Sequence, residues 1–196
     1  MFIFKYDKEI DKKNWERIIS NGRKFGHYFP VNYEIAREDM EVANIKASEF
    51  ANIWSKYEMI FKDKIKNIYK DCDLEKINCY INTSPYSSFN SDNDYISISF
   101  KKKNRRVVPS LLHEINHLLF LRSYKYFCAS IGCTNSDIDK IKEFVTVIND
   151  DVFSPMQDEY WPGHEKYREL ALATWREKND LKRVVEVLKT LLDKEK

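Results

Sequence analysis

Glycine and proline are scarce in this chain of 196 residues, with four and five copies respectively. That shortage argues against an all-β fold, which needs many turns, and against a disordered chain. No apolar run is long enough to span a bilayer, and the net charge is only +2. We therefore expect neither a membrane partner nor a nucleic-acid partner. Apolar side chains instead recur every three or four residues, which predicts a mostly helical protein.

Cysteine is also infrequent, and the pair Cys128 and Cys133 has no second well-spaced pair to complete a zinc-ribbon site. The apolar start at residues 1–4 becomes charged too early for a signal peptide. We therefore expect a cytoplasmic protein with reduced thiols that lie in the core or in loops. The four cysteines are Cys72, Cys79, Cys128 and Cys133.

Two of the four histidines stand four positions apart in the apolar stretch 111–120, as His113-Glu114-Ile115-Asn116-His117. Residues i and i+4 share one face of a helix, so both imidazoles can bind one metal ion. The carboxylate of Glu114 can then reach a water on that ion, which is the H-E-x-x-H arrangement. The alternative is a polar stripe without a metal, but the strongly apolar context favours the metal.

The N-terminal part is predicted to be helical at residues 7–20 and again at 32–69. The second stretch is long for one helix, so it should bend near Ala47-Ser48 or divide in two. Between them lies an aromatic loop at 25–30, in which His27 is expected to be packed or exposed to solvent rather than a metal ligand. Two amphipathic helices, 165–174 and 180–192, should close the chain.

Strands are predicted where the apolar period changes to two, at residues 76–82 and 94–100. Residues 1–4 could join them in one small sheet, with a polar loop at 83–93. In the second strand, Tyr95 and alternate serines should form a solvated face. The basic block 101–106 is expected to be a solvated loop rather than a nucleic-acid patch.

The metal helix should begin near Val107 or Val108, with Pro109 in its first turn, and run to about Phe127. The whole chain, 1–196, is predicted to be one α+β domain with a small sheet beside this helix. Its parts would be an N-terminal helical region (1–70), a core (71–151) and C-terminal helices (152–196).

A catalytic zinc takes three protein ligands, so two histidines are not enough. Metzincins continue with glycine and histidine at the offsets that Phe120 and Ser123 occupy here, which excludes that class. A second helix is predicted after the loop 131–135, with a capping-box pattern at 136–139. If it folds back on the first helix, Glu143 becomes the third ligand. The rival ligands are Asp139, Asp150, Glu159 and, most seriously, His164.

The motif at 113–117, the downstream Glu143 and the strand at 95–100 together resemble a compact gluzincin-type zinc metallopeptidase. The resemblance covers roughly residues 77–151. It implies a zincin-like α+β fold and an extended substrate bound at the edge of the 95–100 strand. The chain departs from the family at Val147, where an acidic residue often follows the ligand glutamate by one turn.

The resemblance assigns Zn²⁺ to His113, His117 and Glu143, with Glu114 as general base. Asn149 or Asp150 could replace the missing acidic residue behind the ligands. The substrate would be a peptide or protein.

The oxyanion of the reaction needs a donor, for which the candidates are His164, Tyr160 and Tyr86 in that order. His164 ranks first because it follows Trp161-Pro162-Gly163 at an expected helix start. Two other functions remain open: a non-catalytic metal-binding or scaffold protein, and a regulatory protein acting on a partner. Glu114 favours the enzyme, because a structural metal site needs no base beside its ligands.

Overall fold

The computed structural model describes the chain except residues 1, 25–33, 71, 73, 75–76 and 155–163, and except the side chains of residues 21–24 and 150. His27, Glu159 and Tyr160 lie outside the described residues, as does the side chain of Asp150. The same holds for the Trp161-Pro162-Gly163 segment before His164.

Helices dominate the described chain, and four short strands form one mixed sheet, which confirms the predicted α+β class. No helix in the described part is long and apolar enough to cross a membrane. The strands are β1 (Phe2–Tyr6), β2 (Ile77–Asn82), β3 (Ser88–Asn90) and β4 (Tyr95–Ser99). The helices are α1 (Lys8–Lys24), α2 (Arg37–Ser55), α3 (Glu58–Ile68), α4 (Asn104–Ser130), α5 (Asn135–Phe144), α6 (Val147–Val152), α7 (Glu165–Lys178) and α8 (Leu181–Lys194).

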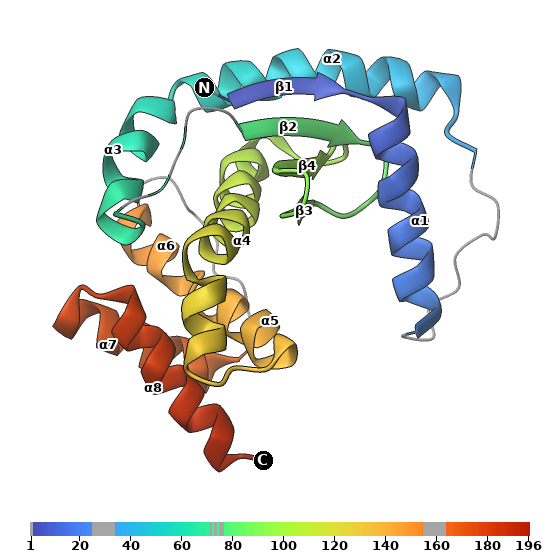
Figure 1. The fold of residues 1–196 in the computed structure, drawn as a ribbon. Coiled ribbons are helices and arrows are strands. Elements are labelled where there is room, and N and C mark those ends of the chain that lie inside the picture. The colour runs from blue at the N-terminus through green and yellow to red at the C-terminus, as the bar shows by residue number, and fades with distance from the viewer. Residues whose placement is uncertain (1, 25–33, 71, 73, 75–76, 155–163) are drawn as a thin grey trace.

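The sheet has the order β1-β2-β4-β3, in which β1, β2 and β4 are parallel and β3 is antiparallel to β4 (Figure 1). The N-terminal strand therefore joins the sheet as predicted. The stretch 83–93 is not only a loop, because it contains β3. The expected substrate-binding edge on strand 95–100 is therefore occupied at Tyr95–Ser97, where β3 pairs with β4. The sheet edge beside it belongs to β3.

Both faces of β4 are buried, so the prediction that Tyr95, Ser97 and Ser99 face solvent is wrong. Helix α1 lies on the polar side and pairs with the Ser97 hydroxyl, whereas the Ser99 hydroxyl donates to Ser84 O. Asn14 Nδ2 donates to Ser97 Oγ at 2.8 Å, and Asn82 Nδ2 donates to the same oxygen at 2.7 Å. Burial of a polar face is stable when its groups are paired in this way.

The break between α2 and α3 falls at residues 56–57, not at Ala47-Ser48. This position lets Trp54 and Phe61, on either side of the break, both contact the Phe2 ring. The ring centroids lie 4.8 and 5.6 Å from that of Phe2. Edge-on aromatic contacts of this kind add to the gain from burial, so packing decides where the helix ends.

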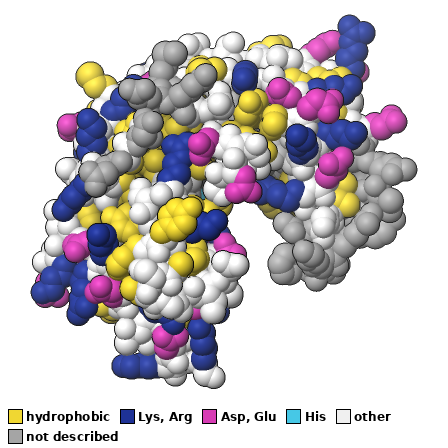
Figure 2. All heavy atoms as spheres, in the orientation of Figure 1, with side chains coloured by type: hydrophobic (Ala, Val, Ile, Leu, Met, Phe, Trp, Pro, Cys, Tyr) yellow, Lys and Arg dark blue, Asp and Glu magenta, His cyan; other side chains and the backbone are white. Residues whose placement is uncertain are grey.

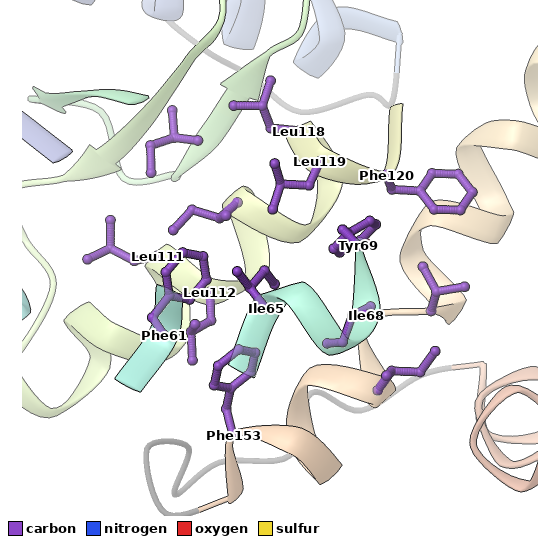
Figure 3. Packing of buried hydrophobic residues seen from close by; sticks show 14 of the residues in the cluster. Phe61, Ile65, Ile68, Tyr69, Leu111, Leu112, Leu118, Leu119, Phe120 and Phe153 are labelled. Atoms are coloured by element: carbon purple, nitrogen blue, oxygen red, sulfur yellow. The ribbon is translucent and has the colours of Figure 1, made fainter. Parts of the chain in front are cut away.

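Helix α4 lies against the sheet on one side and against α3 on another, and most of its central residues are buried (Figure 3). It begins at Asn104, earlier than predicted, so Pro109 lies inside the helix rather than in its first turn. Figure 3 shows the side chains that pack α3 and the end of α6 against α4. They include Phe61, Ile65, Leu111, Leu112 and Phe153.

A glycine turn reverses the chain after α4. Gly132 has a positive φ of 81°, Gly132 N–H donates to Ala129 O at 3.1 Å, and Cys133 N–H donates to Cys128 O at 3.0 Å. This is a Schellman C-cap, which satisfies carbonyls at the end of α4. All four cysteines are in the described part and none forms a disulfide.

Helix α5 starts with a capping box, but not at 136–139 as predicted. Thr134 is the N-cap: its hydroxyl accepts from Asp137 N–H at 3.2 Å, and Asp137 Oδ2 accepts from Thr134 N–H at 3.0 Å. The α5 helix then runs back beside α4 (Figure 1). The two predicted C-terminal helices are present as α7 and α8.

Candidate metal centre

The two motif histidines lie on one face of α4 with their ring nitrogens turned toward each other. His113 Nε2 and His117 Nε2 are 2.9 Å apart, and the side chains are 20% and 3% exposed. The opposite faces of the helix are held by buried apolar residues, including Ile115. The hydrophobic core therefore holds the other faces of this helix.

Helix α5 brings a carboxylate to the same place. Glu143 Oε2 lies 3.7 Å from His113 Nε2 and 3.3 Å from His117 Nε2. Within the described residues, these three form a group of ligand atoms all within 4.8 Å of one another that could hold a metal ion. The predicted return of the second helix therefore brings Glu143 to the histidines.

The donor set fits a tetrahedral zinc. Zn–N and Zn–O bonds of about 2.0–2.1 Å place neighbouring ligand atoms about 3.3 Å apart in a tetrahedron. The three separations between ligand atoms, 2.9, 3.3 and 3.7 Å, bracket that value. A three-ligand site of this kind leaves one position open for water.

The protonation states also suit a cation. Burial, with the neighbouring charge of His117, lowers the pKa of His113 to about 3. Burial would raise the pKa of Glu143, but the hydrogen bond and charge of His117 and the charges of His113 and Lys142 lower it to about 2. At neutral pH His113 is therefore a neutral imidazole and Glu143 a carboxylate, the forms that bind metals.

Glu114 lies beside the group without belonging to it. Its side chain is buried, and this burial raises its pKa to about 7, against the charges of His117, Arg17 and Lys102. It lines a cavity of about 160 Å³ together with His113. A carboxyl group with a pKa near neutrality is suited to accept and return a proton.

Strand β3 also borders the histidines. The Phe89 ring centroid is 5.1 Å from that of His117, and Lys142 Nζ lies 5.7 Å from the Phe89 ring. Lys142 Nζ is also 3.6 Å from Glu143 Oε1. The sheet edge and the ligand helix thus meet at the candidate site.

Two side chains from other segments also donate hydrogen bonds to the motif helix α4. Tyr69 OH donates to Asn116 Oδ1 at 2.7 Å, and Asn116 stands between the two histidines. Asn149 Nδ2 donates to Leu112 O at 3.1 Å, one residue before His113. Val147 is buried in the core.

Two of the rival ligands, Asp139 and His164, lie in the described part of the chain. Asp139 is exposed and pairs with Lys142 at 3.0 Å. His164 is exposed at the start of α7, with a left-handed φ of 60° and its ring centroid 5.1 Å from that of Phe144. Neither belongs to the group that could hold a metal in the described part of the chain.

Three further residues near the site were not identified from the sequence. Lys102 and Ser110 line the cavity beside Glu114. Arg168, from α7, is 5% exposed, donates from Nη1 to Thr146 Oγ1 at 3.0 Å, and its charge contributes to the low pKa of His113. Ser110 could have been found from its spacing, three residues before His113. Arg168 could not, because only the fold brings α7 here.

Comparisons with protein-family models, with curated proteins and with solved structures found no match for this chain.

Proposed function

We propose that this protein is a zinc-dependent peptidase. The observation that carries the proposal is the buried Glu114 carboxylate beside a group of two histidines and a glutamate that could hold a metal. A metal site that only stabilises a fold closes its coordination with four protein ligands and uses no adjacent base. Three ligands with a neighbouring carboxylate of raised pKa are the arrangement of hydrolytic zinc sites.

His113, His117 and Glu143 would hold the ion. When bound, zinc acidifies a water molecule and polarises a peptide carbonyl. Glu114 would accept the proton from the attacking water and pass it to the leaving amine. Its buried position and the charges of nearby cations set its pKa near neutrality, so it can do both.

The chain must also supply a donor to the oxyanion that develops on the carbonyl. Tyr86 lines the cavity with Glu114 and His113, which supports this role for its hydroxyl. His164 is not among the described residues that line the cavity. Its expected role as first-ranked donor stays a prediction.

The test separates metal binding from catalysis. Wild type should contain about one zinc per chain by elemental mass spectrometry, and His113→Ala should lose it. Glu114→Gln should keep both the zinc and the thermal stability but lose peptide hydrolysis by a factor on the order of 10²–10⁴. Cleavage is measured on a proteome-derived peptide mixture by mass spectrometry.

The matched control is Glu38→Gln, the same change at an exposed site on α2, which should leave both readouts unchanged. A wild-type protein that holds zinc but cleaves no peptide would refute the peptidase. Protein purified without zinc from zinc-replete medium would refute the metal site itself.

A further inference from the structure

The cavity of about 160 Å³ beside Glu114 lies between two segments that are far apart in the sequence. One wall is the loop 85–87, between β2 and β3. The other comes from Lys102, just before α4, and from the face of α4 that carries Ser110, His113 and Glu114. At about 30 Å³ for each water molecule, the space suits one amino-acid side chain.

Lys102 is the one cation among the described residues that line this cavity. It is half-buried, whereas its neighbours Lys101 and Lys103 are exposed. Burial lowers the pKa of Lys102, whereas the charge of Glu114 raises it, so the two side chains are electrostatic neighbours. Of the three consecutive lysines, only Lys102 is turned toward the site.

Ser110 supplies a second polar group. Its side chain is 2% exposed, and its hydroxyl has no hydrogen-bond partner within the described residues. Buried hydroxyls are nearly always paired, so an unpaired one requires an explanation. Ser110 stands three and four residues before His113 and Glu114, and therefore on the same face of α4.

We propose that this cavity binds a carboxylate of the peptide substrate, held by the Lys102 ammonium and the Ser110 hydroxyl. The carboxylate belongs to an aspartate or glutamate side chain next to the cleaved bond, or to the C-terminus of the peptide. The proposal rests on the peptidase function and specifies its substrate class. The cavity adjoins the bond to be cleaved because His113 and Glu114 line it.

Other occupants fit less well. A basic side chain would meet Lys102, and an apolar one would strip water from its ammonium group without replacing that hydration. The Glu114 carboxylate is not an obstacle once a divalent ion is bound. The charge of the ion then offsets the carboxylates of Glu114 and Glu143 and leaves Lys102 to face the ligand.

The first experiment reads cleavage positions in a peptide mixture whose C-termini are either free or amidated. Wild type should prefer Asp or Glu over Asn or Gln at one position flanking the cut by about 10- to 100-fold in kcat/KM, the range of a charge-assisted hydrogen bond. If the C-terminal carboxylate is the ligand, the same preference should appear for free over amidated ends. Cleavage without either preference would overturn the proposal and leave the peptidase intact.

Variants assign the preference to residues. Lys102→Ala should reduce it to about onefold, and Lys102→Glu should shift it toward Lys or Arg. Ser110→Ala should reduce it without loss of stability, because its hydroxyl makes no bond that folding depends on in the described structure. Lys103→Ala, one residue away and exposed, is the matched control and should retain the preference.

A binding measurement does not depend on catalysis. The probes are acetyl-alanyl-glutamyl-alanine amide, its glutamine analogue, and acetyl-alanyl-alanine with a free C-terminus, titrated against zinc-loaded Glu114→Gln protein by ligand-detected NMR. A carboxylate probe should bind about 10-fold tighter than the glutamine peptide, and Lys102→Ala should remove the difference. Equal affinities would overturn the carboxylate site even if no substrate is ever cleaved.

Discussion

Zinc should stabilise the folded protein by joining α4 to α5, and this effect should depend on Glu143. The motif histidines come from α4 and the third ligand from α5, with the glycine turn between them. Because the three ligand atoms meet only in the folded chain, the ion binds the native state and not the unfolded one. Binding free energy therefore becomes stability.

The size of the effect follows from this linkage. Free zinc at 100 times its dissociation constant adds about 2.7 kcal/mol to the free energy of unfolding. For a chain of 196 residues, each kcal/mol raises Tm by about 2–4 °C, so we expect a rise of roughly 5–11 °C. If Glu143→Ala weakens zinc binding about 100-fold, the same zinc concentration adds only about 0.4 kcal/mol, or roughly 1–2 °C.

The assay is differential scanning calorimetry of metal-free protein with and without zinc in a weak metal buffer. Asp139→Asn is the matched control, because it removes an exposed carboxylate one turn earlier on the same helix. It should keep the full rise in Tm. Glu143 is not the third ligand if Glu143→Ala gains as much stability from zinc as wild type does, or if Asp139→Asn loses the effect.

Two further changes test the supports of the site. Tyr69→Phe should lower the free energy of unfolding by about 1–3 kcal/mol in urea melts, because it leaves the buried Asn116 acceptor without its donor; unchanged stability would show that the bond is unimportant. Burial would raise the pKa of Asp137, but its hydrogen bonds to Lys196 and Thr134 lower it to about 2 from 3.8. Its contribution is therefore complete above about pH 4 and is lost as the pH falls toward 2. Thr134→Ala should cost about 1 kcal/mol near neutrality because it removes the hydroxyl that accepts from Asp137 N–H. It should keep most of the acid dependence, since Lys196 and Thr134 N–H still hold the Asp137 carboxylate; a profile without loss of stability toward pH 2 would contradict this.

Much of the fold follows from local patterns. Periods of three to four residues identify the helices, and alternation identifies β2 and β4, because each signal comes from neighbours in the sequence. Strand β3 was missed because three residues in a polar stretch carry no period. The polar face of β4 was misread because only the fold shows that α1 covers it and that Asn14 pairs with Ser97.

The candidate site also has features that the sequence predicts and features that it does not. The histidine spacing is local, and Glu143 could be predicted because one short turn returns α5 to α4. The cavity could not be predicted, since it needs the loop 85–87 to meet Lys102 and Ser110 from another segment. Patterns within one helix can be predicted from the sequence, whereas contacts between distant segments depend on the whole fold.

From the parallel pairing of β1 with β2 we expect an order of assembly. Phe2 pairs with Ile77, whereas Asn78 pairs with Tyr95 and Ser88 with Ser97. Short chain loops close faster than long ones, so β2, β3 and β4 should associate before the N-terminal strand can join them. Helix α4 follows β4 directly in the chain and should form together with this early unit. The N-terminal strand and the helix after it should then dock last, so that folding ends with the closure of the polar side of the sheet.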